Sequence, residues 1–109
     1  MRKTKRMRLE RAGWRVASTR EFLGLSDEEA AFVEMKLSLA QSLRRQRQKQ
    51  GLSQMQLAKL LESSQSRVAK MEAGDRSVSL DLLVRSLLAI GTTKRQLARI
   101  IASERRSAA

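Results

Sequence analysis

Residues 52–74 read LSQMQLAKLLESSQSRVAKMEAG, and this stretch decides the fold. Ser53 is suited to cap a first short helix, the polar run 62–64 interrupts the pattern, and Gly74 ends a second short helix. In each helix the apolar residues return at three- and four-residue spacing, so each helix has one face to bury. Two helices this short cannot bury enough surface alone, and we therefore expect further helices to pack against them.

The flanking sequence supplies those helices. A capping box, Ser26 with Glu29, predicts the start of a long helix that runs to residue 49. Ser79 and Thr93 are expected to cap two more helices, over 80–90 and 94–101. The predicted fold class is all-α, a compact domain of five or six helices. The long helix should carry an apolar stripe of Ala30, Val33, Leu37, Ala40 and Leu43, and the common core should contain Leu43, Leu57, Ala58, Leu61, Val68, Met71, Leu83, Leu87 and Ile90.

The chain divides into a basic N-terminal extension at 1–25, the helical domain at 26–102 and a C-terminal tail at 103–109. Residues 1–20 carry eight basic side chains and one acidic one. Within the extension, 3–12 fit a short helix, and the alternating apolar and polar residues 14–18 predict a short edge strand. The basic extension is either a solvated arm or a segment that tracks phosphates.

The amino-acid composition reduces the number of possible functions. The chain has 109 residues with 23 Lys and Arg against 11 Asp and Glu, a net charge of +12 that favours polyanionic partners. It contains no Cys and no His, which excludes disulfides, the usual zinc ligands and a Cys/His nucleophile pair. We therefore expect no enzyme activity, metal or cofactor, although carboxylate-based metal chemistry is not excluded. No apolar run is long enough to span a membrane and no secretory signal is evident, so we expect a cytoplasmic protein without a membrane partner.

The 52–74 motif resembles the helix-turn-helix of the XRE family, which includes the Cro and lambdoid phage repressors. The resemblance extends over residues 36–101 and implies a lambda-repressor-like fold that binds double-stranded DNA. It departs from the family at Glu62, where many relatives have glycine in the turn, and at Ser63, which replaces a frequent apolar residue. Glu62 must therefore adopt a left-handed conformation, or the turn takes another geometry.

The resemblance also implies roles for single residues. Gln54 would donate to a backbone phosphate and brace the second helix, whose N-terminal residues face the edges of bases in the major groove. Arg47 and Glu72 would form a structural ion pair. The predicted DNA-binding residues are Gln54, Ser64, Gln65, Ser66, Arg67, Lys70, Arg76 and Ser77, of which Gln65, Ser66 and Lys70 would face bases and Arg67, Arg76 and Ser77 phosphates.

The interpretation that follows is a sequence-specific transcriptional repressor acting as a homodimer. The alternative is an antitoxin that neutralises a ribonuclease toxin and represses its own operon, because residues 22–30 resemble the segment before the helix-turn-helix in HigA-like antitoxins. A nuclease is a weaker alternative, because no spaced set of carboxylates converges on the basic face. An RNA-binding protein is a weaker alternative too, because A-form RNA has no readable major groove. Two surfaces are available for a dimer: the strand 14–18, or the last helix through Leu97, Ile100 and Ile101, whose apolar residues exceed what packing on Leu87 and Leu88 needs.

Overall fold

The computed structural model describes residues 24–103, and the helix expected at 3–12, the strand expected at 14–18 and most of the C-terminal tail lie outside them. The described chain forms five helices and no strand, as the predicted all-α class requires. These helices are α3 (Asp27–Lys49), α4 (Gln54–Leu60), α5 (Gln65–Ala73), α6 (Leu80–Ala89) and α7 (Lys94–Ala102).

A serine or threonine begins every one of these helices. Its hydroxyl accepts a hydrogen bond from a backbone N–H in the first turn, at Ser26, Ser53, Ser64, Ser79 and Thr93. Three of the caps are reciprocal capping boxes, including the predicted pair of Ser26 and Glu29. Four of these caps, at Ser26, Ser53, Ser79 and Thr93, were predicted from the sequence.

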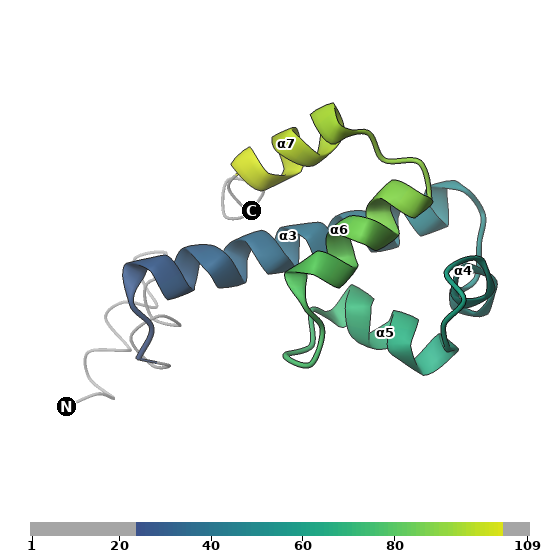
Figure 1. Cartoon of the computed structure of the whole chain (residues 1–109), viewed down its shortest axis with the longest axis horizontal. Coiled ribbons are helices and arrows are strands. Elements are labelled where there is room, and N and C mark those ends of the chain that lie inside the picture. The colour runs from purple at the N-terminus through teal and green to yellow at the C-terminus, as the bar shows by residue number, and fades with distance from the viewer. Residues whose placement is uncertain (1–23, 104–109) are drawn as a thin grey trace, which may run out of the picture.

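Helix α3 supports three of the other four helices of the described chain. Helices α5, α6 and α7 all contact it, and α4 packs on α5 (Figure 1). Seven large side chains are fully buried in the core between these helices: Leu39, Leu43, Leu57, Val68, Met71, Leu83 and Leu87. Of the nine core residues predicted, Leu61 alone is only partly buried, and Leu39, Val78 and Leu97 join the core without having been predicted.

Two expectations about packing are wrong. In the stripe on α3, Ala30 is buried as expected but Val33 is exposed, because the N-terminal part of α3 extends beyond α5, α6 and α7 (Figure 1). The last helix, α7, lies along α3 and leaves Leu88 of α6 exposed. Leu97 is therefore buried in the core, and Ile100 is partly buried against the core. Of the three residues expected to be available for a dimer, only Ile101 is exposed.

No helix within residues 24–103 is long and apolar enough to cross a membrane.

Candidate nucleic-acid interface

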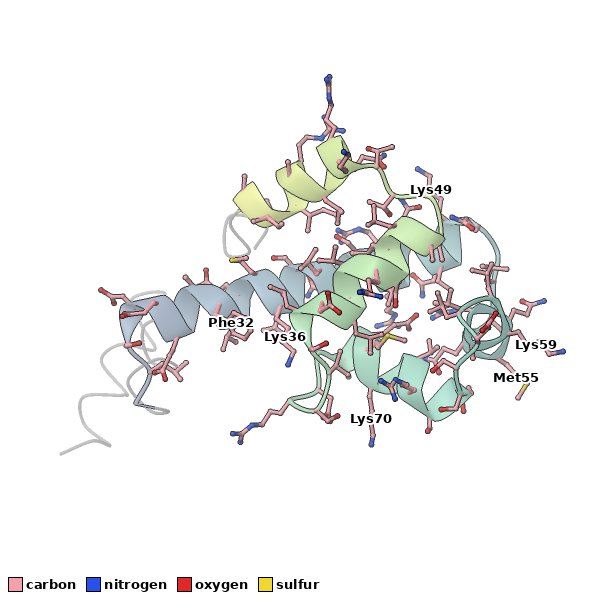
Figure 2. All side chains as sticks on the ribbon, in the orientation of Figure 1. Phe32, Lys36, Lys49, Met55, Lys59 and Lys70 are labelled. Carbon is pink, nitrogen blue, oxygen red and sulfur yellow. The ribbon has the colours of Figure 1, made fainter. Side chains whose placement is uncertain are left out.

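Helix α5 has one buried face and one polar face. Val68 and Met71 are completely buried against the other helices. The remaining polar side chains of its first two turns are exposed: Gln65, Ser66, Arg67 and Lys70. In Figure 2 the Lys70 side chain points away from the body of the molecule. Helix α5 thus presents exposed amide, hydroxyl and cationic groups at its N-terminal end.

The turn before α5 settles the geometry that the sequence left open at Glu62. This residue is the single non-glycine residue of the described chain with a positive φ, 56°. The left-handed conformation lets the N–H of Glu62 donate to the Lys59 carbonyl and that of Ser63 to the Ala58 carbonyl, which closes α4. Ser64 then caps α5 by accepting from the Arg67 N–H at 3.1 Å.

A chain of hydrogen bonds fixes the start of α5. Gln65 Nε2 donates to Gln54 Oε1 at 2.8 Å, and Gln54 Nε2 donates to Glu72 Oε1 at 3.1 Å. Glu72 also pairs with Arg47 of α3, whose Nη2 lies 3.1 Å from the same Oε1. The predicted Arg47–Glu72 ion pair is therefore present, and Gln54 connects it to the exposed end of α5.

The Gln54 carboxamide keeps one further donor. An Nε2 group carries two N–H bonds, and a single one is used on Glu72. Gln54 is thus held rigidly by Gln65 and Glu72 while an N–H remains for an external acceptor. This geometry suits the bracing role that the resemblance implied.

The loop after α5 begins at a glycine that no other residue replaces easily. Gly74 has φ 69°, and a Cβ built on it would lie 2.6 Å from Leu37 Cδ2. The position therefore requires both a left-handed backbone and a close approach to α3. This brings the following residues, 75–77, alongside α5.

Ser77 folds the loop onto Asp75. Its N–H and its hydroxyl both donate to Asp75 Oδ1, at 2.8 and 2.7 Å. These hydrogen bonds, the backbone one foremost, hold the pKa of the Asp75 carboxyl below its ordinary value, and the charges of Lys70 and Lys36 add to the effect. Ser77 was predicted to contact a phosphate, but here both of its donors are used within the loop.

Arg76 lies between these two residues with an exposed side chain. Its carbonyl accepts a hydrogen bond from Lys36 Nζ of α3 at 3.5 Å, and Figure 2 shows the Lys36 side chain reaching from α3 toward this loop. Sequence reasoning missed Lys36, because nothing local connects residues 40 positions apart. The loop that carries Arg76 is thus tied to α3 as well as to α5.

A hollow of about 350 Å³ runs beside α5 and brings most of the predicted residues together. Its walls come from α5, the loop after it and the start of α6, and they include Ser64, Ser66, Arg67, Lys70 and Ser77. Gln65 and Gln54 adjoin each other through their hydrogen bond. The surface therefore combines cations with hydrogen-bonding groups around one protruding helix, the arrangement of a protein that reads a groove in a polyanion.

The comparisons with known proteins agree with this geometry. The model of a helix-turn-helix domain matches residues 38–100, which are more than half of the chain. No curated protein and no solved structure matches. The chain therefore belongs to the helix-turn-helix domain family, part of the XRE-like superfamily of DNA-binding regulators.

Proposed function

We propose that this protein is a sequence-specific transcriptional repressor that inserts α5 into the major groove of double-stranded DNA. The observation that carries the proposal is the polar, protruding face of α5 on a rigid support. A major groove about 12 Å wide admits a helix, and short polar side chains at its N-terminal end are the groups that reach base edges.

Each exposed residue receives a role from its position. Gln65, Ser66 and Lys70 read bases: a glutamine pairs with adenine N6 and N7, and a lysine with guanine O6 and N7. Arg67, Arg76 and the remaining N–H of Gln54 contact phosphates. Ser64 positions the start of α5 against the DNA backbone. We assign Ser77 to shaping the loop, because its donors are used on Asp75.

The experiment begins with selection of bound fragments from a random-sequence duplex pool. Lys70→Ala should then lower affinity for the selected site by about 5- to 150-fold, the equivalent of about 1–3 kcal/mol for a base contact, and change random duplex binding little. Lys59→Ala is the matched control, because Lys59 is an equally charged, exposed residue on the neighbouring helix α4. Equal losses on both kinds of DNA would contradict a base-reading role for Lys70.

Arg76 should behave differently from Lys70. Arg76→Ala is expected to weaken binding to every duplex and to flatten the dependence of log affinity on log salt by about one unit, since one phosphate contact is lost. Arg95→Ala, on α7, removes the same charge away from α5 and serves as the control. An unchanged slope for Arg76→Ala would place the phosphate contact on another side chain.

The second candidate function, an antitoxin, is favoured by a separate surface. The projecting part of α3 exposes Phe32 and Val33. Such an apolar surface suits a protein partner. Co-expression with the product of the adjacent reading frame tests this: Phe32→Asp should abolish a complex that Met55→Asp, a change at an exposed apolar residue of α4, leaves intact. No complex with the parent chain would remove this candidate.

A further inference from the structure

A second basic site lies between α3 and α7. A hollow of about 660 Å³ opens along the C-terminal half of α3, where α7 packs on it. Its volume falls within the range of about 300–1,000 Å³ typical of small-molecule sites. Figure 1 places α7 on one side of α3 and α5 on the other, so this hollow is separate from the surface assigned to DNA reading.

Three cations line this hollow: Arg45 and Lys49 from α3, and Arg99 from α7. No acidic side chain of residues 24–103 lines it, and within this range none of the three cations takes part in an ion pair. Figure 2 shows Lys49 on the side of α3 where α7 lies. Three like charges around one concave surface repel one another, and an anion between them would relieve that repulsion.

Neutral donors complete the lining. Gln96 uses its Oε1 to close the cap of α7 on Thr93, which leaves its Nε2 donor without a partner among the described residues. The Thr92 hydroxyl is buried in the inner wall and has no hydrogen-bond partner there either. Arg45 has one bond, from Nη2 to Ser42 Oγ at 3.2 Å, so most of the donors of its guanidinium remain.

We propose that the α3–α7 hollow binds phosphate groups through Arg45, Lys49 and Arg99. Phosphate fits this set better than a single carboxylate does. It brings up to two negative charges and several acceptor oxygens to three cations, and guanidinium groups bind it with paired N–H donors. The phosphate group belongs either to a free organic phosphate or to the backbone of a nucleic acid that contacts α3 on the side where α7 lies.

The test compares two charge-matched double variants of the full chain. Arg45→Gln with Arg99→Gln removes two cations from the hollow. Arg44→Gln with Arg95→Gln removes two exposed cations from the same two helices, at residues that do not line it. Calorimetric titration with pyrophosphate at near-physiological salt should show saturable binding to the parent. The first pair should weaken that binding by about tenfold or more, the scale of a lost charge-assisted hydrogen bond, and the second should leave it within about twofold.

A random-sequence duplex distinguishes the two sources of phosphate. If the first pair lowers duplex affinity and its salt slope more than the second, the ligand is a nucleic-acid backbone. If both pairs affect the duplex equally while only the first impairs pyrophosphate binding, the ligand is a free phosphate. The proposal is overturned if neither probe distinguishes the two pairs, or if Lys70→Ala weakens pyrophosphate binding as much as the first pair does. Both readouts are independent of whether α5 reads a particular sequence, so the repressor proposal can fail while this one stands.

Discussion

Glu72 is a buried carboxylate that joins three helices. Its side chain is 4% exposed, yet it accepts from Arg47 Nε, Arg47 Nη2 and Gln54 Nε2, while Arg47 Nη1 donates to the Leu52 carbonyl at 2.7 Å. Because donors from Arg47 of α3 and Gln54 of α4 converge on Glu72 of α5, the three helices are fixed relative to one another. The orientation of α5 therefore depends on a side chain that lies outside its exposed polar face.

Glu72→Ala should cost about 3–5 kcal/mol of unfolding free energy, because it strands the Arg47 guanidinium in a largely buried place. The contrast is Arg85→Ala, which breaks an ion pair with Asp81 whose side chains are 76% and 75% exposed. That change should cost less than about 1 kcal/mol. Urea denaturation of both variants measures the difference, and equal small losses would show that Glu72 is not stabilised as its geometry implies.

Asp75 allows a prediction about pH. Its pKa is lowered from 3.8, chiefly by the backbone N–H of Ser77 and next by the Ser77 hydroxyl. A carboxyl with a lowered folded pKa adds stability above the unfolded value, and this contribution is lost as pH falls through the folded pKa. Ser77→Ala should therefore raise the pKa of Asp75 part of the way back, because the backbone bond remains.

NMR titration of the Asp75 carboxyl carbon measures that shift. Ser66→Ala, at an exposed serine of α5 without a bond to Asp75, should leave the curve unchanged. A Ser77→Ala protein with the parent titration curve would mean that the hydroxyl does not stabilise the carboxylate in solution.

At the scale of elements, the turn between α4 and α5 holds Glu62 in a left-handed conformation that is unfavourable for a residue with a side chain. A left-handed backbone costs a residue with a side chain about 1–2 kcal/mol, and glycine avoids that cost while losing about 0.5–1 kcal/mol of entropy. Glu62→Gly should thus raise the unfolding free energy by about 0.5–1 kcal/mol. Gly74→Ala, the reverse change at the other end of α5, should lower it by at least about 1 kcal/mol. Thermal melts of the two variants test the pair, and a destabilised Glu62→Gly would mean that the side chain contributes more than the strain costs.

Elements of this protein were predictable where the signal is local. Predicted serine and threonine caps marked four of the five helix starts in the described chain, and Gly74 marked the end of α5, because each acts within a few residues. What depends on packing partners was not predictable: Val33 has the right spacing for the core but none of the helices within residues 24–103 covers it, and α7 lies along α3 instead of covering Leu88. In the site, the Arg47–Glu72 pair was predicted from the family resemblance. The contact of Lys36 with the Arg76 carbonyl was not predicted, because only the tertiary fold brings these two residues together.

At the scale of the whole molecule, the proposed reading of DNA by one helix, α5, bears on assembly. One such helix reads about four or five base pairs, too few for a genomic site, so a symmetric dimer on two half-sites about 34 Å apart is the expected solution. Leu97 and Ile100 belong to the core and its edge, which leaves Ile101, 40% exposed, as the apolar residue of α7 available to a second copy. The segment 14–18 offers the other candidate surface.

Sedimentation equilibrium of the parent chain should give a dimer, and Ile101→Asp should give a monomer, because a carboxylate buried in an apolar contact is not tolerated without a partner. Arg95→Asp places the same group on another face of α7 and should leave the dimer intact. Deletion of residues 1–18 tests the alternative surface. If the deletion yields a monomer while Ile101→Asp remains dimeric, the N-terminal segment forms the interface. If the parent is a monomer even on its selected DNA, a symmetric dimer is not how this protein gains specificity.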